Sequence, residues 1–186
     1  ASPAEMNVTV DPLGNVIARV AGKRRAARTL LFAAHMDEVG LIITGATEEG
    51  YLRFAPVGGI DPAVAYGRRV RVNGRPGVIG GRAFHQCSEE ERGKAVPLNK
   101  LLIDLGAANR EEALAIAQPG DTAVFDSDFT KLEGGLFKAR ALDDRAGCAL
   151  LLDLAAETPE YDITLAFTVQ EEVGLRGAKT AAYAVE

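Results

Sequence analysis

The sequence has no tryptophan, and its 186 residues include only two cysteines, two histidines and two methionines. Cys87 and Cys148 are far apart in unrelated contexts, so no disulfide framework is expected. No apolar run approaches the roughly 20 residues that span a bilayer, and the N-terminus carries no signal-peptide core. The net charge of −5 gives no reason to expect nucleic acid or an anionic membrane as a partner. These absences favour an ordinary globular protein of a reducing cytoplasm.

Two kinds of hydrophobic pattern are present. Residues 1–40 alternate apolar and polar residues around a turn at residues 12–15, and then form a short apolar run typical of a strand buried on both faces. Residues 137–186 contain a helical pattern, a strand and a second helical pattern, an order that predicts a mostly parallel sheet. Residues 41–136 are short alternating segments separated by glycine, with a turn at Asn73–Gly74 and one helix capped by Asn109. We therefore predict a partial α/β lobe interrupted by an inserted β-rich domain with one helix.

Side chains that can bind metal follow three segments of the predicted α/β lobe. These clusters are His35, Asp37 and Glu38; Asp143 and Asp144; and Glu171 and Glu172. Sites in open parallel sheets form at the carboxyl ends of the strands, so the three clusters can converge. An imidazole with several carboxylates is the ligand set of Zn²⁺, Co²⁺ or Mn²⁺ rather than of Ca²⁺. Two divalent cations would also neutralise a carboxylate cluster that otherwise could hardly stay ionised.

Each cluster also has a purely structural interpretation. His35 can be a core histidine bonded to a backbone carbonyl, and either residue of the aspartate pair can cap the following helix. The glutamate pair can belong to a first helical turn, where the helix dipole favours negative charge. All three structural interpretations would have to hold together, and this requirement favours the metal site.

The spacing within the clusters suggests how they would divide the chemistry. Asp37, two residues after His35, can accept the ring N–H of a metal-bound imidazole. In the pair Glu171 and Glu172, one carboxylate can bind metal while its neighbour acts as general base on a metal-bound water. The sequence therefore favours a hydrolase.

Three segments carry a resemblance to a known family. In chain order, and with the β-rich insertion between the first two, they read AAHMDEVG, ALDDRAG and QEEVGLRGA. They resemble the M42 family of metallo-aminopeptidases, the tetrahedral group also labelled glutamyl or deblocking aminopeptidases or, formerly, endoglucanases. The resemblance extends along essentially the whole chain. It implies a dinuclear-metal enzyme that removes N-terminal residues from peptides by a metal-bound hydroxide, with two zinc or cobalt ions, or manganese.

The resemblance also implies a role for each residue. His35 resembles a terminal metal ligand oriented by Asp37, and Asp143 resembles the carboxylate that bridges the two metals. Glu171 resembles the general base, and Glu172 a ligand of one metal.

Two further features are implied by the resemblance. In related enzymes the peptide between such an aspartate pair as Asp143 and Asp144 is cis. The inserted domain resembles the one through which these enzymes pair into dimers, which assemble further into a hollow dodecamer.

The chain departs from the family pattern at both ends. It has no match to the family's N-terminal helix or to two further ligands, an aspartate beyond the glutamate pair and a histidine near the C-terminus. His85 lies in a polar, predicted loop of the insert and matches neither. We therefore expect a fragment, and for the 186 residues alone an inactive assembly module is the alternative function. A glycosidase, following the older label, needs only two carboxylates but leaves the His-x-Asp and Asp-Asp clusters unexplained.

Overall fold

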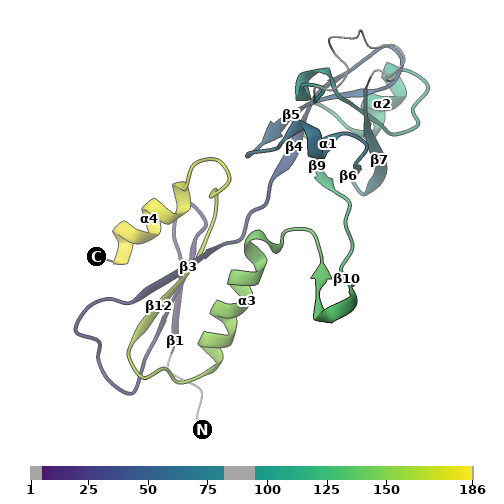
Figure 1. Cartoon of the computed structure of the whole chain (residues 1–186). Coiled ribbons are helices and arrows are strands. Elements are labelled where there is room, and N and C mark those ends of the chain that lie inside the picture. Colours follow the sequence, from purple (N-terminus) through teal and green to yellow (C-terminus); the bar gives the residue numbers. More distant parts are fainter. Residues whose placement is uncertain (1–5, 82–94, 186) are drawn as a thin grey trace. The chain divides into compact units, whose positions relative to one another are not determined.

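The computed structural model describes residues 6–81 and 95–185, and His85 and Cys87 lie outside these residues. The fold is mixed α/β and consists of two compact units (Figure 1). Unit 1 comprises Ala1–Glu38 and Ala141–Glu186, and unit 2 comprises Val39–Arg140. Among the described residues, no helix has the length and apolar character needed to cross a membrane.

Unit 1 is built on a four-stranded sheet with the order β1-β2-β12-β3. The strands are β1 (Met6–Val10), β2 (Val16–Val20), β3 (Leu31–His35) and β12 (Ile163–Thr168). The pairs β1–β2 and β2–β12 are antiparallel, and only β12–β3 is parallel. The sheet is therefore mixed rather than mostly parallel. The short turn between β1 and β2 can join only antiparallel neighbours. The antiparallel pairing of β12 with β2 is instead a contact between segments that are remote in the sequence.

The predicted turn between β1 and β2 is present, and one side chain organises it. Asp11 Oδ1 accepts hydrogen bonds from the backbone N–H groups of Leu13, Gly14 and Asn15, each at 2.9 Å. Gly14 has a φ of 104°, which a residue with a side chain rarely adopts. The aspartate and the glycine together set the hairpin and the position of Asn15.

Two helices lie on opposite faces of this sheet, α3 (Leu142–Ala156) and α4 (Arg176–Val185) (Figure 1). Because side chains alternate along a strand, β2 and β12 present one set of residues to each helix. On the α3 face the core includes Val20, Cys148, Leu151 and Leu165. On the α4 face it is Ile17, Ala166 and Ala181.

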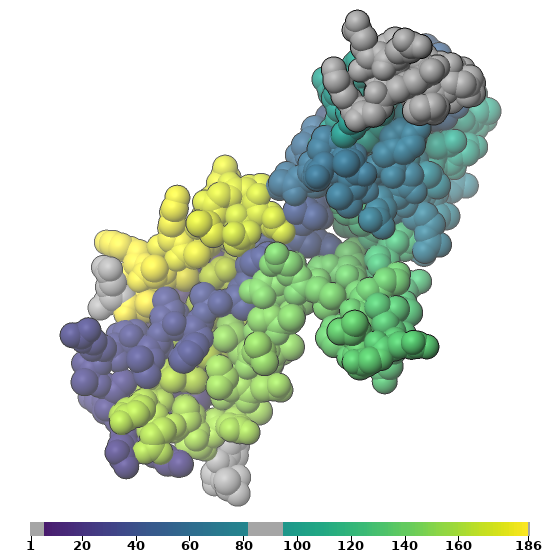
Figure 2. Space-filling view, in the orientation of Figure 1, coloured from purple at the N-terminus to yellow at the C-terminus, as the bar shows by residue number. Residues whose placement is uncertain are grey.

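Much apolar surface of unit 1 is left open among the described residues. On β1, Met6, Val8 and Val10 are all exposed. On α3, Leu150 and Leu154 are exposed, and the space-filling view shows this helix in light green on the surface of its unit (Figure 2).

Unit 2 is a closed six-stranded antiparallel barrel with the order β4-β5-β8-β7-β6-β9. Its strands are β4 (Gly40–Ala46), β5 (Leu52–Val57), β6 (Arg69–Val72), β7 (Arg75–Gly80), β8 (Leu102–Asp104) and β9 (Thr122–Phe125). The turn between β6 and β7 is Asn73–Gly74, as predicted, with φ of 49° and 78°. Closure leaves no free edge in the barrel, and its interior is filled by apolar residues such as Leu41, Leu52 and Ile103.

The remaining elements of unit 2 are short. They are α1 (Pro62–Ala65), α2 (Arg110–Ile116), the 3₁₀ turns η2 (Leu98–Lys100) and η3 (Glu133–Gly135), and a hairpin of β10 (Thr130–Lys131) and β11 (Phe137–Lys138). The helix predicted to start at Asn109 is α2, and the Asn109 side chain accepts a hydrogen bond from Glu112 N at 3.0 Å. Glu112 in turn accepts from Ala108 N at 2.9 Å, so the helix start is satisfied from both sides.

Candidate metal centre

His35 lies at the carboxyl end of β3, where it pairs with Thr168 of β12. The residue is buried, and its backbone is held on both sides, because its N–H donates to Asp144 Oδ2 at 3.3 Å and its carbonyl accepts from the Cys148 thiol at 3.3 Å. The ring Nδ1 lies 3.1 Å from the backbone carbonyl oxygen of Asp37. A proton on Nδ1 would satisfy this contact and leave the Nε2 lone pair available as a ligand.

The acceptor of the imidazole N–H differs from the one that the sequence predicted. The carboxylate of Asp37 is 3.7 Å from Nδ1, farther than the carbonyl of the same residue. The carboxylate is engaged elsewhere, because Oδ1 accepts from Glu171 N at 3.1 Å and Oδ2 accepts from Glu172 N at 3.2 Å. Asp37 therefore ties the end of β3 to the backbone of the glutamate pair.

The other ring nitrogen of His35 faces the acidic side chains. Nε2 lies 3.0 Å from Asp143 Oδ1 and 3.9 Å from Glu171 Oε2. His35, Glu171 and Glu172 also offer ligand atoms that all lie within 4.8 Å of one another. The three clusters that follow separate segments of the sequence thus meet at one end of the sheet of unit 1.

The two aspartates make different contacts, Asp144 with the backbone of α3 and Asp143 with the imidazole of His35. The Asp143–Asp144 peptide is cis, as the resemblance implies. Asp144 Oδ1 accepts from Gly147 N at 3.0 Å, so the predicted cap of α3 is present in this residue. Its neighbour Asp143 makes no cap; its side chain is 91 % exposed and its Oδ1 is the atom beside His35 Nε2. The structural interpretation therefore accounts for one aspartate and leaves the other free for chemistry.

Glu171 and Glu172 lie on a tight loop, residues 170–176, that connects β12 to α4 and includes Arg176, the first residue of α4. The loop is closed by hydrogen bonds from Arg176 N to Gln170 O and from Gly177 N to Val169 O, at 3.1 and 3.0 Å. Because α4 begins only at Arg176, the glutamates are not in its first turn, and the helix-dipole interpretation of the pair is wrong.

The crowding of charge shifts two ionisation equilibria. Burial and then the negative charge of Glu171 raise the pKa of the Glu172 carboxyl. Burial lowers the pKa of His35, but the hydrogen bond to Asp143, the Asp37 carbonyl and the nearby carboxylates outweigh it, so the pKa is raised. Neighbouring carboxylates contribute to both shifts, and a divalent cation would offset their charge when bound.

Two residues near the cluster have structural roles. Arg145 donates from Nε to the Met36 carbonyl at 2.7 Å and so braces the segment after His35. Cys148 is a buried free thiol, and burial raises its pKa, which makes it a poor nucleophile.

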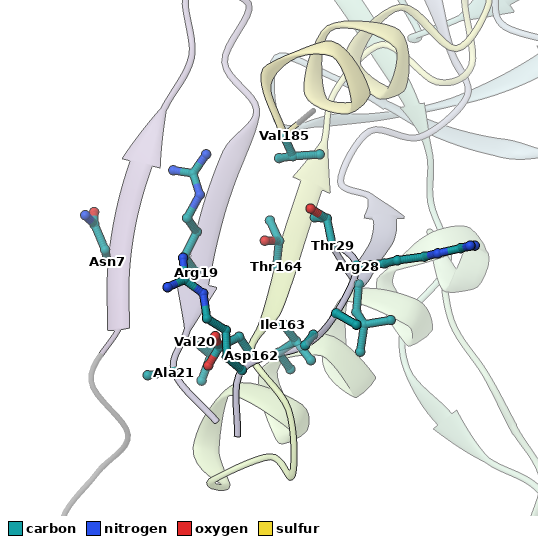
Figure 3. Close-up of a pocket in the computed structure, with 14 residues that line it drawn as sticks. Asn7, Arg19, Val20, Ala21, Arg28, Thr29, Asp162, Ile163, Thr164 and Val185 are labelled. Atoms are coloured by element: carbon teal, nitrogen blue, oxygen red, sulfur yellow. The ribbon is translucent and has the colours of Figure 1, made fainter. Parts of the chain in front are cut away.

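A cavity of about 580 Å³ lies at the opposite end of β12 from the glutamate loop, near Ile163 and Thr164 (Figure 3). Its lining includes Arg19 and Arg28, but in Figure 3 these two side chains point away from each other and do not converge on one ligand. The acidic cluster, not this cavity, is therefore the candidate site.

The fold and the acidic cluster define a mixed α/β protein with a candidate metal centre of histidine and carboxylates. The chain belongs to the M42 glutamyl aminopeptidase family, whose model matches residues 14–186.

Individual relatives agree with this assignment. The chain is 42 % identical over 181 residues to a putative aminopeptidase of Acetivibrio thermocellus, covering 96 % of this chain and 52 % of the relative. It is 35 % identical over 187 residues to the lysyl aminopeptidase of Pyrococcus furiosus, covering 96 % and 53 %. The chain thus spans about half the length of the curated relatives it matches.

Solved structures agree as well. A TET aminopeptidase from a marine-sediment Thaumarchaeota archaeon has a TM-score of 0.87 and 37 % identity, with 98 % of this chain and 54 % of that chain covered. The TET1 peptidase of Pyrococcus horikoshii, described as assembling into a tetrahedron or a large octahedral shell, has a TM-score of 0.81 and 42 % identity, with 97 % and 56 % covered.

Proposed function

We propose that the protein is a metal-dependent aminopeptidase that removes N-terminal residues from peptides. The observation that carries the proposal is the position of His35 Nε2, 3.0 Å from Asp143 and 3.9 Å from Glu171. Membership of an aminopeptidase family supports the same reaction class. The two alternatives from the sequence, an inactive assembly module and a glycosidase, are not favoured by these relatives.

We assign two divalent cations to this site, zinc or cobalt, with manganese as an alternative. His35, Asp143 and Glu172 would hold them, because one imidazole nitrogen and several carboxylate oxygens are the donors these ions take. The orientation of the imidazole supports this assignment, since its Nδ1 faces a carbonyl oxygen and its Nε2 faces the carboxylates. When bound, such ions lower the pKa of water and polarise a carbonyl group.

Glu171 is the general base in this proposal. Its Oε2 lies 3.9 Å from the imidazole, close to the cluster without a hydrogen bond to it, and its side chain is one third exposed, so water and substrate can reach it. Glu171 would take a proton from the attacking water and pass it to the leaving amine. Asp37 would hold the loop of Glu171 and Glu172 in place through their two backbone N–H groups.

Membership of an aminopeptidase family supports cleavage from the amino end. The free α-amino group of a peptide is a cation, and the carboxylate of Glu171, which is not assigned to a metal ion in this proposal, could contact it. A peptide would therefore enter with its N-terminus first, and blocking that amine would remove this contact.

Self-association is part of the proposal. Relatives are described as a dodecamer and as tetrahedral or octahedral shells. We assign the inserted domain, residues 41–136, to pairing of two copies, with residues 1–40 and 137–186 as the two parts of the catalytic lobe.

Hydrolysis of aminoacyl-p-nitroanilides, before and after removal of metal by a chelator, tests the proposed activity. We expect cleavage to stop on chelation and to return with Co²⁺ or Zn²⁺, and N-acetylated substrates to be left intact. Metal-independent cleavage, or equal cleavage of acetylated substrates, would contradict the proposal.

A further inference from the structure

Asn15 is fully buried, with an exposed fraction of 0 %, although its side chain is polar. Its Nδ2 lies 2.6 Å from Asp11 Oδ2, 2.8 Å from Thr180 Oγ1 and 2.9 Å from the carbonyl oxygen of Gly177. Its Oδ1 accepts a hydrogen bond from Val169 N at 3.0 Å. These contacts fix the side chain, because the two N–H groups and the carbonyl oxygen of a buried amide lose free energy when they are left without partners.

These partners lie at the two ends of one loop. Val169 precedes, and Gly177 follows, the loop 170–176 that carries Glu171 and Glu172. Asn15 therefore clamps both ends of the glutamate loop, and it is itself anchored to the β1–β2 turn through Asp11.

The packing around Asn15 leaves no space for a side chain at Gly177. A Cβ atom on Gly177 would lie 2.1 Å from Val169 O and 2.4 Å from Asn15 Oδ1, closer than atoms can approach. Only glycine lets the start of α4 come this near to the end of β12.

The loop needs restraint from outside. Two of its non-glycine residues, Gln170 and Leu175, have positive φ angles of 56° and 58°, a region that such residues rarely occupy. Asp37 holds the tip of the loop through Glu171 N and Glu172 N, and Asn15 holds its two ends.

We propose that Asn15 is a positioning residue for the metal centre. By fixing both ends of the glutamate loop, it keeps the Glu171 and Glu172 carboxylates within reach of His35. The inference rests on the proposed function in one respect, that these side chains meet a metal ion. Asn15 itself touches neither metal nor substrate, so its removal changes the site through the loop alone.

Cobalt titration of the metal-free protein tests this role. We expect Asn15→Ala to weaken Co²⁺ binding about 10-fold or more, the usual effect of losing a group that orients ligands. Backbone hydrogen exchange gives a readout that does not need metal, and we expect faster exchange in residues 170–177 of the variant. The matched control is Thr164→Val. Thr164 is a buried polar residue of β12, at the end of that strand far from the glutamate loop, and both measurements should stay at the parent values.

A second variant keeps the test open if Asn15→Ala does not fold. Thr180→Val removes a single partner of Asn15 and should give a smaller change in the same two readouts. A folded Asn15→Ala protein with unchanged Co²⁺ affinity and unchanged exchange would overturn the inference, as would a parent protein that binds no Co²⁺. If the parent protein binds Co²⁺ more tightly than the Asn15→Ala variant but cleaves no peptide, the proposed function alone would be overturned.

Discussion

Unit 2 closes its strands into a barrel, whereas unit 1 ends its described sheet in two open edges, β1 and β3. The barrel interior includes Leu52, Ile79 and Ile103 with no measurable exposure. In unit 1, by contrast, the buried core against α3 contains few residues, and Leu150 and Leu154 of α3 are exposed to solvent. Every residue proposed to act in catalysis belongs to unit 1.

The difference follows from what each architecture does with the ends of its strands. In the barrel, neighbouring strands are antiparallel, so adjacent strands end at opposite rims. In the sheet of unit 1, the parallel pair β3 and β12 end side by side, where β3 ends at His35 and β12 leads into the loop that carries Glu171. Parallel neighbours end at the same edge, so polar side chains from remote segments meet there. We therefore expect substitutions in the two units to have different kinds of effect.

The largest expected effect is loss of activity without loss of stability, in unit 1. Glu171→Gln should lower kcat about 10²- to 10⁴-fold, because a positioned general base contributes that much. Metal content, measured on the same sample, should stay close to that of the parent. Glu111→Gln on α2 of unit 2 is the control and should change neither quantity. A matching loss of metal in the Glu171 variant would make that residue a ligand and reverse the assignment.

The next effect is loss of stability, in unit 2. Leu52→Ala removes a fully buried side chain from the barrel and should lower the free energy of unfolding by about 2–5 kcal/mol. Leu150→Ala on α3, where the side chain is 65 % exposed, should change it by no more than about 0.5 kcal/mol. Urea denaturation of both variants measures the contrast. Equal losses would mean that α3 is covered in solution.

Metal should stabilise one unit and not the other. At a free Co²⁺ concentration 100-fold above the Kd, binding should add about 2.7 kcal/mol to the stability of the state that binds it. Hydrogen exchange should therefore slow around His35 and Glu172, while exchange in the barrel strands stays constant. His35→Ala should abolish the difference. Slower exchange in the barrel alone would place the ion outside the acidic cluster.

The smallest effect concerns acid stability. Although burial raises the pKa of Asp11, hydrogen bonds from Asn15 and the turn amides outweigh it, so the pKa is lowered. A lowered folded-state pKa contributes stability above the ordinary aspartate value, and this contribution is lost as the pH falls through the folded-state value. The fall in the stability of unit 1 at acidic pH is its acid limb, and Asp11→Asn should make this fall shallower. The control is Asp121→Asn in unit 2, where the Gln118 amide and Asn73 lower the pKa, and it should leave that limb unchanged. An unaltered limb in the Asp11 variant would contradict this linkage.

Local chemistry in the sequence was enough to predict several features. Asn73–Gly74 predicts the β6–β7 turn because glycine and asparagine accept positive φ, and Asn109 predicts the start of α2 because its side chain caps a backbone N–H. The proximity of these side chains was predictable in part. His35 ends a strand and the glutamate pair follows one, as predicted, whereas Asp143 follows no strand of the sheet and lies at the start of α3. The assignment of these residues as ligands stays a prediction. Each of these inferences depends on residues a few positions apart.

Other features depend on contacts that only the folded chain makes. The Asp37 carboxylate bonds to the backbone of Glu171, 134 positions away, and the Asn15 amide bonds to Gly177, 162 positions away. A backbone N–H carries no residue identity, so no spacing in the sequence indicates such an acceptor. For the same reason the mixed strand order of unit 1 was missed. The sequence by itself determined which side chains could bind metal and where the turns form; the tertiary structure alone decided what holds those side chains together, because that depends on distances between remote segments.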